Sequence, residues 1–265
     1  MLTSRIITAA VLVAIVLVCL LWLPSWAMAA AFGAAWTVGA WEWGRLVGLP
    51  GKIVWIYTAL VVVLGAASGS SLDAGTAAAI ASLASCWWVL AFAGVVAYPW
   101  RVPSALVAVA GLLALVPSWL LLVSIHSSSA RGPVVVLSLL CVVWAADVGA
   151  FFSGRAFGRV KLAPNVSPGK TWEGVLGGLA AATIVGSVAG MLLGQAAVTW
   201  ALIALAAALA SIVGDLTVSL CKRRVGMKDS SHLLPGHGGI LDRIDSLTAA
   251  VPVFWLGSSL AGLLA

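Results

Sequence analysis

The sequence predicts an all-α, polytopic integral membrane protein with about nine transmembrane helices. Of the 265 residues, 63% are hydrophobic and only 8% are charged, whereas about a quarter of the residues of a soluble globular domain are charged. The apolar residues also form long continuous runs, which lack the alternation of a membrane β-barrel strand. So few charged residues could not cover a water-facing surface, and most of the surface must therefore face lipid.

Nine apolar runs approach or exceed the roughly 20 residues that a helix needs to cross a bilayer. The first, 6–23, precedes Ala27-Met28-Ala29, a pattern that also fits a cleaved secretory signal. We favour an uncleaved first helix, because the run is long for a signal core. The second and third runs are short. The later runs lie at 27–43, 53–68, 76–98, 104–125, 133–152, 174–193, 197–220 and 247–265.

The distribution of lysine and arginine predicts the orientation, because these residues are retained in cytoplasmic loops. With the N-terminus inside, 13 of the 14 basic residues fall in inside segments and only Arg131 lies outside. The sequence therefore predicts an N-in/C-out topology. Nine of the basic residues crowd into two inside segments, 153–173 and 221–246. We accordingly divide the chain into N-terminal helices, 1–130, and a C-terminal catalytic region, 131–265, with two cytoplasmic polar loops.

Two carboxylates, Asp147 and Asp215, lie within apolar sequence. A charge inside a membrane helix is costly unless it faces a partner or water. Each aspartate could pair with a neighbouring arginine, or could serve a cation or substrate site. Asp215, Ser219 and Lys222 share one helix face, since they stand at i, i+4 and i+7. This pattern favours a functional role for Asp215, while the role of Asp147 stays open.

A glycine-rich segment, 226–239, follows this helix. Glycines let backbone amides approach phosphate oxygens, and a helix that starts near Ile240 would favour anions at its N-terminus. Asp242 and Asp245 lie one turn apart on that helix, with Arg243 between them. Acidic residues in a first turn often only complement the helix dipole. Together with Asp215, however, they offer the oxygen ligands that Mg²⁺ prefers.

The other polar loop contains Lys170 beside a Pro-Gly turn. This lysine could hold a phosphate or a lipid headgroup, but the spacing of a P-loop is absent. General attraction to an anionic leaflet would explain Arg155, Arg159 and Lys161 equally well. Their roles stay open.

Several segments match a known family pattern. Residues 219–223 (SLCKR), Lys228-Asp229 and residues 235–245 (PGHGGILDRID) resemble the signature of CDP-diacylglycerol synthases, also called phosphatidate cytidylyltransferases. Residues 161–174 and 144–147 resemble further motifs of that family. Cys221 and Ser231 depart from the usual pattern, but neither carries a charge that the chemistry needs.

The resemblance implies a Mg²⁺-dependent transfer of CMP from CTP to phosphatidate, with release of pyrophosphate. It also implies a homodimer. We expect a bacterial-type cytoplasmic membrane, with the active site facing the cytoplasm as the basic residues predict, and no nucleic-acid partner. Carried over by motif, Asp215, Asp242 and Asp245 would bind the metal and act in catalysis with Lys222 and Arg223. The substrate-binding residues would be Lys170, Ser219, Lys228, Asp229, His237, Gly238, Gly239 and Arg243.

Two other functions are compatible with parts of the sequence. One is a CTP-using relative that acts on another lipid, such as a polyprenol kinase or an archaeal-type lipid cytidylyltransferase; a kinase would form CDP and a phosphorylated alcohol. A transporter of anionic solutes would need polar residues through the outer halves of its helices. Here the polar residues gather at the cytoplasmic end instead, which favours an enzyme.

Overall fold

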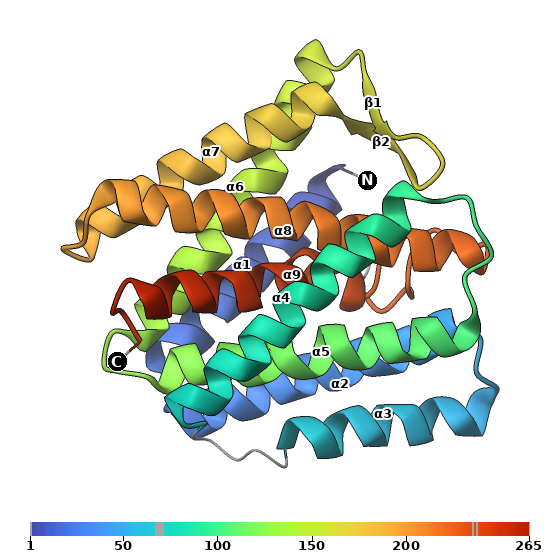
Figure 1. Ribbon diagram of the computed structural model, residues 1–265, viewed down its shortest axis with the longest axis horizontal. Helices are drawn as coiled ribbons and strands as arrows, with labels where there is room; N and C mark the ends of the chain where they lie inside the picture. Colours follow the sequence, from blue (N-terminus) through green and yellow to red (C-terminus); the bar gives the residue numbers. More distant parts are fainter. Residues whose placement is uncertain (1, 67–71, 235, 237, 265) are drawn as a thin grey trace.

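The computed structural model describes residues 2–66, 72–234, 236 and 238–264, with the side chains of residues 2–9 left out. Within these residues the chain forms helices and one short β-hairpin (Figure 1). The elements are α1 (Leu2–Trp22), α2 (Ser25–Val47), α3 (Gly51–Ala66), α4 (Ala74–Val96), α5 (Ser104–Ser127), α6 (Gly132–Phe157), β1 (Lys161–Ala163), β2 (Ser167–Thr171), α7 (Trp172–Leu192), α8 (Ala197–Arg224) and α9 (Leu241–Leu260).

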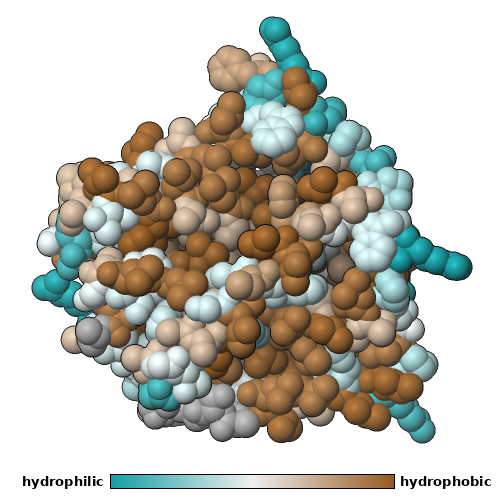
Figure 2. Space-filling model, viewed as in Figure 1, coloured by the Kyte–Doolittle hydropathy of each residue, from teal (hydrophilic) through white to brown (hydrophobic). Residues whose placement is uncertain are grey.

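The helical prediction is confirmed, and the five helices α4 to α8 are each long and apolar enough to cross a membrane. Two further apolar helical stretches are shorter, Ala10–Trp22 and Gly51–Ala66. Exposed large apolar side chains cover the helices. Figure 2 shows that such side chains dominate one face of the molecule, while hydrophilic residues gather along its rim. This distribution fits a polytopic membrane protein.

α8 and α9 lie in the middle of the bundle, and α4 and α6 cross them obliquely (Figure 1). α6 and α7 pack on each other and on α8, whereas α4 and α5 pack against α9, and α2 packs against α3 and α5. The largest fully buried side chains include Trp36, Trp43, Trp200 and Phe254. α9 is therefore enclosed by helices from both halves of the chain.

Small residues bring α6 and α7 unusually close together. A Cβ added at Gly149 would lie 2.7 Å from the carbonyl oxygen of Gly177, and one at Gly178 would lie 2.6 Å from that of Ala146. Larger side chains at these positions would force the backbones apart, because membrane helices approach closely only through small residues.

The connections between helices separate into two groups at opposite ends of the bundle (Figure 1). At one end, Arg224 of α8 donates to the carbonyl oxygens of Leu46 (3.1 Å) and Val102 (2.7 Å), which lie at the end of α2 and between α4 and α5. At the other end, Arg131 donates to the carbonyl oxygen of Leu193 at 3.3 Å. The structure thus places Arg131 at the end opposite Arg224, as the charge count predicts.

The β-hairpin is a feature that the sequence did not predict. Residues 161–171 were expected to be loop, but Lys161 pairs with Thr171 and Ala163 with Ser167 in antiparallel strands. The Thr171 hydroxyl then accepts a hydrogen bond from the backbone N–H of Gly174 at 3.1 Å and so caps α7. The hairpin sets the position of Lys170 just before this helix begins.

Candidate active site

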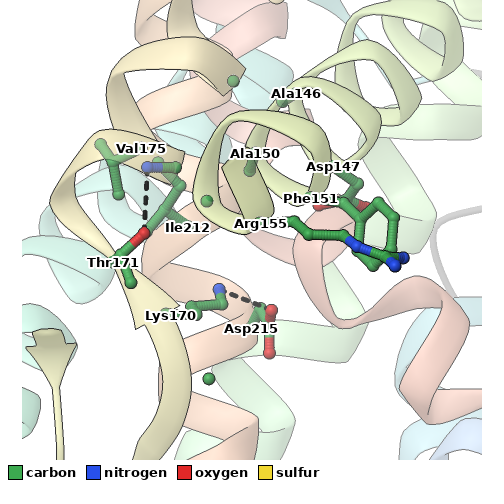
Figure 3. A pocket seen from close by; sticks show the side chains of 14 residues that line it. Ala146, Asp147, Ala150, Phe151, Arg155, Lys170, Thr171, Val175, Ile212 and Asp215 are labelled. Carbon is green, nitrogen blue, oxygen red and sulfur yellow. Dashed lines mark hydrogen bonds and ion pairs between the residues drawn. The ribbon is translucent and has the colours of Figure 1, made fainter. Parts of the chain in front are cut away.

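A cavity of about 410 Å³ lies where α6, α7, α8 and β2 meet (Figure 3). Lys170 of β2 and Asp215 of α8 form an ion pair in its wall, with 2.6 Å between Nζ and Oδ2. Asp147 and Arg155 of α6 line the same cavity. The rest of the lining is small or apolar and consists of Ala146, Ala150, Phe151, Gly154, Gly169, Thr171, Gly174, Val175, Gly178 and Ile212. The cavity therefore combines a charged part with a mostly apolar wall.

One face of α8 carries the residues that the sequence placed there. The Ser219 hydroxyl donates to Asp215 Oδ1 at 3.1 Å, one turn along the helix. Lys222 lies a further turn on and is buried, and its Nζ is 2.7 Å from Asp242 Oδ1 of α9. The predicted shared face is thus confirmed. Asp215 on this face is paired with Lys170, and Asp242 on α9 is paired with Lys222.

Asp242 also holds the glycine-rich loop. Its Oδ2 accepts from the backbone N–H groups of Ser230 (2.9 Å) and Gly239 (3.0 Å), and from the Ser230 hydroxyl (2.9 Å). Gly238 has φ +77°, and a Cβ there would lie 2.6 Å from the same oxygen. A side chain at Gly238 would therefore be strained in two ways. Asp242 fixes the loop against α9 through these bonds.

Asp245 is buried one turn further along α9, where the backbone N–H of Ser246 donates to its Oδ1 at 2.7 Å. It interacts electrostatically with Asp215, Lys222 and Asp147. The charges of Asp147, Asp215 and Asp245 therefore influence one another. Within the described ranges, no three His, Cys, Asp or Glu side chains are gathered closely enough to hold a metal ion. The three-aspartate metal set remains a prediction, with Asp242 turned toward Lys222 and the loop.

The remaining predicted residues lie at the end of α8, in the loop that follows it and at the start of α9. Arg223 is exposed and donates through Nε to the carbonyl oxygen of Val166 at 3.2 Å, which ties α8 to the turn of the hairpin. Arg243 interacts electrostatically with Asp147. Lys228 is exposed and Asp229 is half-buried in the same loop. His237 lies outside the described residues.

The sequence analysis assigned no role to Glu42, a completely buried carboxylate of α2. It accepts hydrogen bonds from the backbone N–H groups of Ile240 (3.2 Å) and Leu241 (2.6 Å), at the start of α9. The hydroxyls of Ser230 and Ser231 are also bonded to it. The available signal was a single acidic residue within an apolar run. Its partners lie nearly 200 residues away in the sequence.

Comparison with known proteins decides the family. Residues 3–260 match the model of the cytidylyltransferase family. The chain belongs to this family. It is 45% identical over 270 residues to a phosphatidate cytidylyltransferase of Pseudomonas aeruginosa, covering 96% of each chain. It is 39% identical over 289 residues to one of Haemophilus influenzae, covering 96% of this chain and 97% of the relative.

A third relative matches over a shorter stretch. The phosphatidate cytidylyltransferase of Brucella suis is 47% identical over 123 residues, or 46% of this chain. The matches to the first two relatives run nearly end to end, however, so this cytidylyltransferase shares both halves of the fold with them. The similarity to these two relatives therefore covers the N-terminal helices as well as α8 and α9.

Proposed function

We propose that this cytidylyltransferase transfers CMP from CTP to phosphatidate and forms CDP-diacylglycerol and pyrophosphate. The observation that carries the proposal is the nearly end-to-end similarity to two bacterial phosphatidate cytidylyltransferases. The products place the enzyme in phospholipid biosynthesis.

The cavity suits the lipid substrate. Phe151, Val175 and Ile212 offer an apolar wall, and Phe151 is exposed on the outer surface of the helices, where lipid chains could reach it. Arg155 and Lys170 supply positive charge within the same lining. Phosphatidate has this combination of apolar chains and an anionic phosphate. We therefore assign the cavity to phosphatidate, with Arg155 and Lys170 near its phosphate.

The residues around the connection between α8 and α9 suit the triphosphate of CTP. Lys222, Arg223, Lys228 and Arg243 place four basic residues around the α8–α9 connection. The remaining contributors in this proposal are Ser219, Asp229, His237, Gly238 and Gly239.

Mg²⁺ fits the donors that the site offers. Asp215 and Asp245 interact electrostatically across the α8–α9 contact, and carboxylate oxygens with substrate phosphates are the usual ligands of this ion. We propose that Asp215 and Asp245 hold Mg²⁺, and that Asp242 joins them when its contact with Lys222 opens. The ion would neutralise charge that develops on the phosphates.

The chemistry requires little from general bases. A phosphate oxygen of phosphatidate forms a bond to the α-phosphorus of CTP, and the bond from that phosphorus to the β-bridging oxygen breaks. The electron pair leaves with pyrophosphate, and no proton needs to move. The side chains therefore act by positioning two polyanions and by stabilising their charge.

We further propose that the active site faces the cytoplasm in an N-in/C-out topology, and that the protein is a homodimer in a bacterial cytoplasmic membrane. The opposite placement of Arg131 and Arg224 supports this orientation. No nucleic-acid partner is proposed.

The direct test supplies the purified protein with labelled CTP, phosphatidate and Mg²⁺. A labelled liponucleotide and free pyrophosphate are expected. A lipid-alcohol kinase would instead release CDP and phosphorylate an added alcohol. Formation of CDP without liponucleotide would refute the proposal.

A further inference from the structure

Helix α9 carries both Asp242 and Asp245, yet its own sequence does not cap its start. The residue at the cap position is Ile240, which makes no side-chain capping bond. The first N–H groups of a helix have no partner within it and are normally satisfied by a polar side chain just before the first turn. An apolar cap residue means that the acceptor must come from elsewhere in the fold.

That acceptor is Glu42, on a helix more than a hundred residues away in the sequence. Its Oε2 accepts from the backbone N–H of Leu241 at 2.6 Å, and its Oε1 accepts from that of Ile240 at 3.2 Å. Both oxygens are thus directed at the N-terminus of α9, where negative charge is favoured by the helix dipole. Glu42 caps α9 from α2.

The same carboxylate holds the loop before α9. Oε1 accepts from the Ser231 hydroxyl, and Oε2 lies 3.1 Å from Ser230 Oγ. Ser230 Oγ also lies 2.9 Å from Asp242 Oδ2. A Cβ at Gly239 would collide with both Glu42 Oε1 and Ser230 Oγ, so only glycine fits there. Glu42 and Asp242 therefore grip the loop from two sides.

We propose that Glu42 is a positioning residue, which sets the start of α9 and thereby the place of Asp242 and Asp245 relative to Asp215. This inference rests on the proposed function, because it gives those aspartates their role. Glu42 does not line the cavity assigned to phosphatidate. Loss of the Glu42 carboxylate should consequently weaken binding of Mg²⁺ and of the CTP triphosphate but not binding of phosphatidate.

Glu42→Gln is the sharpest variant, because it keeps size and shape. Each carboxylate oxygen accepts from one backbone N–H and lies within hydrogen-bond distance of one serine hydroxyl. A glutamine must point its NH₂ group at one of these two sides, so it would face a backbone N–H that can only donate. Glu42→Asp keeps both oxygens but is one methylene shorter and should give an intermediate effect. Asp73→Asn is the matched control, since Asp73 caps its own helix α4 and asparagine caps equally well.

Two measurements on the full-length protein in detergent test the proposal. Hydrogen exchange at Ile240 and Leu241, without substrates, should be about tenfold faster in Glu42→Gln, since a charged hydrogen bond contributes about a factor of ten or more to local opening. The Mg²⁺ concentration for half-maximal CMP transfer, at fixed CTP, should rise several-fold, while the KM for phosphatidate stays within about twofold. Asp73→Asn should match the wild type in both.

The outcomes separate positioning from mere stability. If Glu42→Gln lowers only the yield of folded protein, with unchanged exchange and Mg²⁺ dependence, the proposal is wrong. Faster exchange with unchanged Mg²⁺ dependence would also overturn it, because the aspartates would then not depend on Glu42. If Glu42→Gln does not fold, Ser231→Ala removes one donor to the same carboxylate and should show a smaller change of the same kind. Should Asp245→Asn keep the wild-type Mg²⁺ dependence, the metal assignment of the proposed function fails, and the exchange at Ile240 and Leu241 still tests the cap.

Discussion

Lys222 of α8 and Asp242 of α9 form an ion pair of 2.7 Å, and the two side chains are only 11% and 7% exposed. Lys222 also interacts electrostatically with Asp245. One ammonium group therefore balances the two acidic residues that α9 brings to the site. This lysine stabilises the α8–α9 contact, and in the proposed function it also binds the triphosphate of CTP.

Removing Lys222 should be costly for the fold. In Lys222→Met, Asp242 and Asp245 would lose their buried counter-charge, and breaking one side of such a pair costs about 3–5 kcal/mol of unfolding free energy. Lys222→Met combined with Asp242→Asn should recover part of this loss, yet neither variant should transfer CMP. Thermal unfolding in detergent and the CMP-transfer assay measure the two effects. A single Lys222→Met variant as stable as the wild type would contradict the structural role.

Asp245→Asn tests the carboxylate cluster. The substitution keeps the volume of a buried side chain but removes charge from the proposed ion site, so CMP transfer should fall by at least about 100-fold. The protein should remain folded, because the substitution lessens repulsion from Asp215. Glu173→Gln, a carboxylate change at the start of α7 outside the cavity lining, should keep the wild-type Mg²⁺ dependence. Full activity of Asp245→Asn would exclude a metal role for this residue.

Arg224 and Arg131 offer a matched comparison of two arginines at opposite ends. Arg224 donates to carbonyl oxygens of Leu46, Val47 and Val102 and to the Ser104 hydroxyl. Arg224→Ala should therefore lower the unfolding free energy by at least about 2 kcal/mol, as charged hydrogen bonds contribute about 1.5–3 kcal/mol each. Arg224→Lys should not restore it, because lysine cannot reproduce the planar set of donors.

Arg131→Ala is the control for Arg224→Ala. Arg131 is exposed and makes one bond of 3.3 Å to a carbonyl oxygen, so its loss should change the unfolding free energy by less than about 0.5 kcal/mol. Equal effects of the two alanine substitutions on thermal unfolding would show that Arg224 does not tie the three segments together.

Val175→Trp should block the lipid part of the cavity. The larger side chain would fill part of the 410 Å³ volume beside Phe151 and Ile212. The KM for phosphatidate should rise by about tenfold, which corresponds to 1.4 kcal/mol of lost binding, whereas the KM for CTP should not change. Val148→Trp adds the same bulk at an exposed position of α6 outside the cavity lining and should be neutral. A raised KM for CTP alone would place the nucleotide, not the lipid, in this cavity.

The sequence predicted the elements that depend on local pattern. Continuous apolar runs gave the helices, and the spacing of Asp215, Ser219 and Lys222 gave the shared face that the 3.1 Å bond confirms. The prediction that a helix starts near Ile240 was also correct. The predicted apolar run begins at residue 247, six residues after the first residue of α9. These features follow from periodicity and composition alone.

Contacts between distant segments could not be read in the same way. Lys170 pairs with Asp215 only because the hairpin turns back onto α8, and strands of three and five residues carry almost no sequence signal. The attachment of Asp242 to Ser230 and Gly239 depends on a loop conformation that glycine permits but does not specify. Glu42 gave the weakest signal, since nothing in its own helix indicates a partner in residues 230–241.

The capping of α9 by Glu42 also limits how the gene for this enzyme can be divided. A gene fragment that begins near residue 131 would encode every residue of the family signature. In its product, however, α9 would follow the cap residue Ile240 with backbone N–H groups that have no acceptor. Arg224 would likewise lose its acceptors on α2. Chimaeras that exchange the first half between relatives should therefore fold correctly only when the donor supplies an acidic residue at the position of Glu42. The N-terminal helices are thus part of the catalytic architecture and are not a replaceable membrane anchor.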